Sequence, residues 1–180
     1  MDSSESLVEI DLGVTPEASI SGAVLLQSEE KAFLTFNAMR DSDRPFRLGE
    51  FTGFYKESAG TAVIELVGCV ITKFGYPNDE GLPEHPLYSF GLADASSSIL
   101  EVVGSAWASD VAAQLRASSE RIWRGRGMKL PDTHRAPGRH FIVLLKEQTF
   151  VCIATTLTVR HYAKDFAEAY SYVQKQLAEH

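Results

Sequence analysis

One apolar run, from Thr61 to Phe74, constrains the fold more than any other part of the chain. Its sequence is TAVIELVGCVITKF, and apolar side chains occupy both faces of the extended segment. A strand that is apolar on both faces is buried on both, which is typical of the interior of a sheet. Gly68 in its middle predicts a bulge or bend. We therefore predict one central strand over residues 61–74.

Several other segments have the composition of strands. Besides the central one, the predicted strands are Ile20–Leu26, Ala32–Met39, a short strand over residues 50–55, Ile99–Val103, His140–Lys146 and Thr149–Val159. The first two are joined by QSEEK and predict a hairpin, and the last two predict a second hairpin. Residues 40–50, which contain DSDRPFRLGE, predict a turn region.

Two segments have the periodicity of amphipathic helices. Ser105 or Ser109 is suited to cap a helix that runs to about Arg124, and Lys164–Glu179 places its apolar residues on one stripe. Glycines and prolines punctuate residues 124–139, which predicts a loop. Together these elements predict an α+β fold, an antiparallel β-sheet with a central helix and a C-terminal amphipathic helix packed on one face.

The chain has 180 residues, of which 44% are hydrophobic and 23% charged, so we expect a single globular domain over residues 1–180. Residues 1–19 are polar and acidic, which predicts a flexible N-terminal arm. The chain start lacks the pattern of a secretory signal, and no apolar run approaches the roughly 20 residues of a membrane span. Cys69 and Cys152 lie in apolar runs, so we expect buried, reduced thiols and a cytoplasmic location.

The net charge of −7 is unevenly distributed. Residues 1–30 carry seven acidic residues and no Lys or Arg, whereas residues 116–139 carry seven basic residues against two acidic ones. A basic patch can bind phosphate or nucleic acid, but Trp123 is its only aromatic residue and the acidic chain repels nucleic acid. We interpret the basic segment as a solvated helix face and loop, and expect neither nucleic acid nor a membrane as a partner.

A loop with the sequence FGYPNDEGLPEHPLY, residues 74–88, follows the apolar run. Its three prolines and two glycines exclude a helix or a central strand. Long ordered loops in compact domains are often functional, and this one is rich in aromatic and polar side chains. We therefore expect a recognition surface centred on the 74–88 loop. In the alternative interpretation, its aromatic residues only attach the loop to the core.

No catalytic or metal-binding motif is assembled in the sequence. Asp79 and His85 lie close together with two glutamates between them, but the spacing matches no EF-hand and no HExxH motif. Ser105 follows a predicted strand in GSAW, yet the GxSxG frame of a nucleophile is absent, so we interpret Ser105 as a helix cap. The RGRG segment at residues 124–127 lacks the spacing of a phosphate-binding loop. We expect no metal and no cofactor.

Three sequence blocks, FGYPNDE…HPL, SAW and HFI…TFVCIA, resemble those of a group of small bacterial proteins with no known activity. The resemblance covers roughly residues 60–157 and transfers no catalytic residue. It implies that the 74–88 loop and the C-terminal hairpin meet in space. The binding residues that we expect on the shared surface are Tyr76, Asn78, Asp79, His85, Tyr88, Trp107, Arg139 and His140.

These observations predict a non-catalytic cytosolic interaction protein that recognises a protein partner, and they leave a homodimer open. The alternative is a small hydrolase that acts on a phosphate-bearing or nucleotide-like small molecule. It would use His85, the loop carboxylates, Arg139 and His140. A concave pocket where these groups converge favours the enzyme, whereas a flatter, aromatic-rich patch favours the binding protein.

Overall fold

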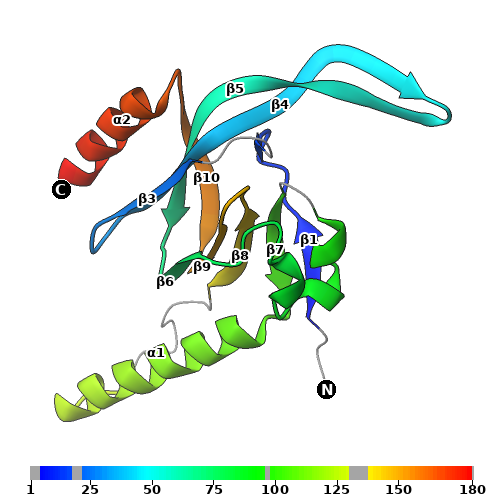
Figure 1. Ribbon diagram of the computed structural model, residues 1–180. Helices are drawn as coiled ribbons and strands as arrows, with labels where there is room; N and C mark the ends of the chain where they lie inside the picture. Colours follow the sequence, from blue (N-terminus) through cyan, green and yellow to red (C-terminus); the bar gives the residue numbers. More distant parts are fainter. Residues whose placement is uncertain (1–4, 18–21, 96–97, 130–137, 180) are drawn as a thin grey trace.

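The structure is a computed structural model that describes residues 5–17, 22–95, 98–129 and 138–179. Two antiparallel sheets form its body (Figure 1). The first sheet has the strand order β1 (Ser6–Glu9), β7 (Ile99–Val103), β8 (Arg139–Leu144), β9 (Thr149–Ala154) and β6 (Ile71–Gly75). The second has the order β10 (Thr156–Ala163), β5 (Phe51–Val67), β4 (Ala32–Leu48) and β2 (Thr15–Pro16), and β3 (Ala23–Gln27) also pairs with β4. The α+β class is confirmed, with two sheets in place of the one predicted.

The two sheets face each other across one apolar core. Phe36 of β4 and Ile64 of β5 lie in the same cluster as Phe141 of β8 and Phe150 of β9. All four side chains are at most 1% exposed. Burying a side chain of this size contributes about 1.5–3 kcal/mol. Substitutions at the interface between the sheets are therefore expected to be strongly destabilising.

The predicted central strand Thr61–Phe74 is wrong, because the chain changes sheets in its middle. β5 ends at Val67 in the second sheet, and the chain then enters β6 in the first. Gly68 has a φ of +62°, a left-handed backbone that glycine adopts without steric cost. The predicted strand Thr149–Val159 divides in the same way into β9 and β10. Both changes of sheet lie at one corner, where the Thr155 N–H donates to the Val67 carbonyl oxygen at 2.8 Å.

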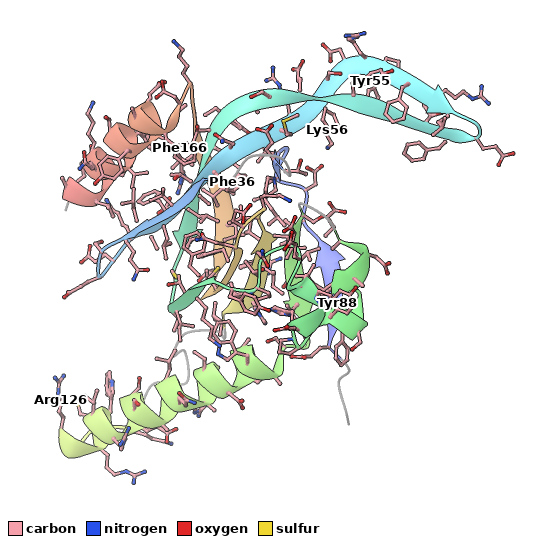
Figure 2. The ribbon with its side chains drawn as sticks, in the orientation of Figure 1. Phe36, Tyr55, Lys56, Tyr88, Arg126 and Phe166 are labelled. Atoms are coloured by element: carbon pink, nitrogen blue, oxygen red, sulfur yellow. The ribbon has the colours of Figure 1, made fainter. Side chains whose placement is uncertain are left out.

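β4 and β5 continue beyond the sheet as a long two-stranded ribbon (Figure 1). The turn predicted over residues 40–50 is therefore wrong, because β4 continues to Leu48 before the chain reverses. Pro45 lies at a shift in the strand register, where its missing N–H does not interrupt a regular ladder. Phe54 and Tyr55 on the ribbon are 50% and 53% exposed, and Figure 2 shows Tyr55 well away from the body of the protein.

Both predicted helices are present. α1 (Ala106–Gly125) begins after its cap, Ser105, and α2 (Phe166–Ala178) lies within the range predicted for the second helix. α2 packs through Ala169 and Val173 on the outer face of the second sheet. α1 instead contacts β8 near its start and extends away from the first sheet (Figure 1). The predicted packing of the helices on one face of a single sheet is not confirmed, since they lie against different sheets.

The outer face of the first sheet carries a smaller apolar cluster. Leu100, Ile142 and Leu144 pack there against leucines from the segment that follows β6. This segment contains three short 3₁₀ helices: η1 (Leu82–Glu84), η2 (Tyr88–Phe90) and η3 (Leu92–Asp94). The loop predicted over residues 74–88 is thus neither a helix of normal length nor a central strand, and it covers part of the sheet.

Some predicted features differ from the structure or fall outside it. In the N-terminal arm, residues 6–9 form an edge strand rather than a flexible segment, because β1 pairs with β7. Residues 1–4 and 18–19 of the predicted arm, residues 20–21 of the first predicted strand, and residues 130–137 of the loop predicted over 124–139 lie outside the described residues.

The two cysteines have different surroundings. Cys152 in β9 is fully buried, and this burial raises the pKa of its thiol. Cys69 is partly buried and lies in the connection between β5 and β6, not in a strand as predicted. In the described part of the chain neither cysteine forms a disulfide, and the inert environment expected for a buried cysteine is clearest at Cys152.

Candidate functional site

A cleft of about 520 Å³ opens on the outer face of the first sheet. Its walls come from β6, the 74–88 loop, the start of α1, and the neighbouring strands β8 and β9. Six of its lining residues are Lys73, Tyr76, His85, Trp107, His140 and Val151. Ligand-binding pockets commonly have volumes of about 300–1,000 Å³, so this cleft has the size of a small-molecule site.

Strand alternation places His140 in the cleft. Phe141 and Val143 of β8 face the core between the sheets, so His140, Ile142 and Leu144 face outward. His140 is the first outward-facing residue of β8, and it meets the N-terminal end of α1.

The 74–88 loop is attached to the β8–β9 hairpin by several contacts. The Thr149 hydroxyl donates to the Pro77 carbonyl oxygen at 2.7 Å, and the Asp79 N–H donates to the Lys146 carbonyl oxygen at 3.3 Å. The Lys146 ammonium also donates to the Asp79 carboxylate at 2.5 Å, and this hydrogen bond lowers the pKa of Asp79. The loop and the hairpin therefore meet in space, which forms one side of the cleft.

A hydrogen bond to Ser105 orients the His140 ring. The Ser105 hydroxyl oxygen accepts from the Ala108 N–H at 3.1 Å and lies 2.8 Å from His140 Nδ1. Among the described residues, Nδ1 is the one acceptor within hydrogen-bond distance of the Ser105 hydroxyl, so we assign the hydroxyl hydrogen to Nδ1 and the imidazole proton to Nε2. His140 is 6% exposed, and its Nε2 has no hydrogen-bond partner among the described residues. His140 lines the cleft, so one residue of the cleft wall carries a buried N–H donor that has no partner among the described residues.

Both histidines of the cleft are uncharged at neutral pH. Burial is the main cause that lowers the pKa of His140 to about 4, and repulsion from His85, once that ring is protonated in acid, and from the Lys73 ammonium adds to it. Burial also lowers the pKa of His85. Since His85 Nδ1 accepts from the Leu87 N–H at 3.1 Å, the proton of the neutral ring lies on Nε2 here too. The cleft therefore offers neutral imidazole N–H donors.

Trp107 contacts both His140 and Lys73. The Trp107 and His140 rings meet edge to face, with centroids 4.9 Å apart and an interplanar angle of 78°. The Lys73 ammonium lies 4.3 Å from the centre of the Trp107 ring, a cation–π contact. In the part of the chain that the structure describes, Lys73 forms no ion pair with a carboxylate. The cleft therefore combines an aromatic surface with a lysine that no carboxylate neutralises directly.

The structure brings together four of the eight predicted binding residues, because Tyr76, His85, Trp107 and His140 all line the cleft. Three others, Asn78, Asp79 and Tyr88, line a separate cavity of about 330 Å³. Arg139 lies apart from both, where its Nε donates to Glu101 Oε1 at 2.8 Å and its guanidinium lies 4.9 Å from the centre of the Phe141 ring.

The sequence analysis did not single out the cleft residue Lys73, and it gave another role to Ser105, which holds the His140 ring. Lys73 belongs to the apolar run, and a charged residue near the end of such a run is a signal that the strand reaches the surface there. Ser105 was interpreted only as a helix cap, since its partner His140 lies 35 residues further along the chain. Across the described ranges, no group of three or more His, Cys, Asp or Glu side chains is placed to hold a metal ion.

Replacing Ser105 with Ala is expected to destabilise the protein by about 1–3 kcal/mol, because α1 loses its cap and His140 Nδ1 loses its donor. Chemical denaturation would measure this loss. Ser109→Ala is the control: the Ser109 hydroxyl donates to the Ser105 carbonyl oxygen at 3.0 Å within the first turn, and its removal is expected to cost less than about 0.5 kcal/mol. Equal effects of the two substitutions would contradict a stabilising role for both the α1 cap and the Ser105–His140 contact.

The comparisons with known proteins identify no relative of this chain. No helix of the described part of the chain is both long enough and apolar enough to cross a membrane. No protein-family model, no curated protein and no solved structure matches the chain.

Proposed function

We propose that this protein is a non-catalytic binding protein and that the cleft beside the 74–88 loop is its recognition site. The observation that carries the proposal is the buried Nε2 of His140, which has no partner among the described residues and belongs to a residue that lines a cleft of small-molecule size. An unsatisfied buried donor costs about 1–3 kcal/mol, and a ligand that supplies an acceptor removes this cost on binding.

The cleft is concave, which is the shape expected for the hydrolase, but the groups that the hydrolase would use do not all converge in it. His85 and His140 line the cleft, whereas Asp79 lines the separate cavity and Arg139 lies apart from both. A flat, aromatic-rich patch would suit a broad protein surface, whereas this cleft suits a small molecule or a single projecting group of a protein partner.

Tyr76 and Trp107 supply aromatic surface, and the prolines at residues 77, 83 and 86 restrict the loop backbone. A restricted loop loses little conformational entropy when a ligand binds, which favours recognition.

The second candidate is the hydrolase, and the 2.8 Å contact between Ser105 and His140 is the observation in its favour. Two features favour binding instead. The Ser105 hydroxyl accepts the capping hydrogen bond of α1, and Ser105 is only 5% exposed. Release of p-nitrophenol from p-nitrophenyl phosphate or bis-p-nitrophenyl phosphate, lost in His140→Gln, would establish the hydrolase in place of the binding protein.

The binding proposal predicts that replacing both Tyr76 and His85 with Ala removes ligand binding and leaves stability nearly unchanged. Tyr76 is 68% exposed and His85 partly exposed, so little core is lost, and we expect Tm to fall by less than about 4 °C. Trp123→Phe leaves Trp107 as the single tryptophan and serves as the background for fluorescence titrations. Benzoate, benzamide and phenyl phosphate are suitable probes, since each combines a planar ring with a hydrogen-bond acceptor.

At least one of the three probes is expected to change Trp107 emission, and the double variant is expected to bind it at least about tenfold more weakly, a loss of about 1.4 kcal/mol. Tyr55→Ala is the matched control, because Tyr55 is 53% exposed on the ribbon away from the cleft. It should bind the probe as the background does. Unchanged binding in the double variant, or no response to any probe up to tens of millimolar, would refute the proposed site.

A further inference from the structure

A carboxylate of the protein itself already occupies one end of the cleft. Glu5 lines the cleft, and its Oε1 accepts a hydrogen bond from the Ala106 N–H, the first residue of α1, at 2.8 Å. The first turn of a helix presents N–H groups without partners inside the helix, and its dipole favours negative charge. Glu5 directly precedes β1, so this carboxylate comes from the N-terminal segment, whereas the other lining residues of the cleft lie between residues 73 and 151.

Two further groups of the same cleft are suited to an oxyanion. The first is His140 Nε2, which lies on a residue only 6% exposed and has no partner among the described residues. The second is the Lys73 ammonium, which lies on the Trp107 ring and has no carboxylate partner in the described ranges. Both donors line the cleft together with Ala106, whose N–H holds Glu5.

The charges on the cleft wall favour a singly charged anion over a doubly charged one. His85 and His140 are neutral at neutral pH, so Lys73 is the positive group and Glu5 the negative group among the lining residues. When the Glu5 carboxylate moves away from the Ala106 N–H, the cleft keeps the positive charge of Lys73 and the neutral N–H donors of Ala106, His85 and His140. This set complements a single negative charge, as on a carboxylate, better than the nearly double charge of a phosphate monoester.

We infer that the cleft binds a carboxylate attached to a planar apolar group, and that Glu5 is a built-in competitor for the same position. This inference rests on the proposed binding function. The ligand carboxylate accepts hydrogen bonds from Lys73 and His140, and takes the Ala106 N–H when Glu5 moves away. The planar group packs against Trp107. Binding is then weakened by the fraction of molecules in which Glu5 holds the site.

Titration of the Trp123→Phe protein with benzoate, benzamide and phenyl phosphate tests the inference. Benzoate is expected to bind more tightly than the neutral benzamide and than phenyl phosphate. Lys73→Met is expected to weaken benzoate binding at least about tenfold, because a charge-assisted hydrogen bond is lost. Glu5→Gln is expected to strengthen it about two- to thirtyfold, the range for the interaction of a carboxylate with a helix N-terminus.

Glu9→Gln is the matched control, since it removes the same charge from an exposed residue of the same N-terminal segment. It should leave benzoate affinity unchanged. The inference is overturned if benzamide or phenyl phosphate binds as tightly as benzoate, or if Glu5→Gln and Glu9→Gln behave alike in proteins of unchanged Tm. If Glu5→Gln lowers Tm, Glu5→Asp provides the second comparison: its shorter side chain holds Ala106 less well and should also strengthen binding. A failure of all three probes would instead refute the proposed function.

Discussion

Ile64→Ala is expected to lower the free energy of unfolding by about 2–5 kcal/mol. Ile64 is fully buried, and it lies in the cluster that joins the two sheets through Phe141 and Phe150. Truncation to Ala removes apolar area from the core and leaves a cavity that surrounding strands fill only in part, because both sheets are held by their own hydrogen-bond ladders. Urea denaturation followed by circular dichroism would measure the loss.

Ile71→Ala is the control for this prediction, since Ile71 is 37% exposed at the start of β6. The two positions belong to the same apolar run, so a single central strand would make both substitutions costly. The structure instead predicts a cost below about 1 kcal/mol at Ile71. A loss below about 0.5 kcal/mol at Ile64 would contradict its place between the sheets.

Acidification is expected to remove up to about 3 kcal/mol of stability through His140 alone. Burial, with His85 and Lys73 as nearby positive groups, lowers the pKa of His140 from its usual 6.5 to about 4. Between these values the unfolded chain binds a proton that the folded protein does not. The contribution of His140 is therefore fully present above pH 6.5 and is lost as the pH falls to about 4.

Urea denaturation of the parent protein and of His140→Gln at several pH values between 7 and 4 tests this effect. Asp79 and Glu101 also have lowered pKa values because of hydrogen bonds from Lys146 and Arg139, and acid weakens both pairs. These losses occur in both proteins, so the difference between the two pH profiles isolates His140. Parallel profiles would show that His140 titrates normally and is not buried as the structure indicates.

Only some residues of the candidate site could be predicted from the sequence. Tyr76 and His85 were expected in the site because three prolines mark the 74–88 loop as a stiff, polar segment. Trp107 and His140 were expected from sequence blocks that resemble those of other proteins. Glu5 was not expected, because its contact with Ala106 joins residues 101 positions apart and leaves no periodic or compositional signal.

Local patterns were sufficient where one short segment controls its own structure. Ser105 can cap α1 with its own side chain, and the stripe of Lys164–Glu179 predicts a helix with one buried face, so both helices were located correctly. The hairpin of β8 and β9 follows from two apolar runs separated by a few polar residues. In each case the stabilising contacts join residues that are close in sequence.

The sheet to which each strand belongs was decided only by the tertiary structure. Both halves of Thr61–Phe74 are apolar enough for a buried strand, and nothing in that pattern shows that β5 and β6 pair with different partners. The same is true of β9 and β10. The physical reason is that side-chain alternation reports burial alone, whereas sheet membership depends on backbone hydrogen bonds to distant segments. The cleft depends on that choice, because Lys73 reaches Trp107 and His140 only when β6 joins the first sheet.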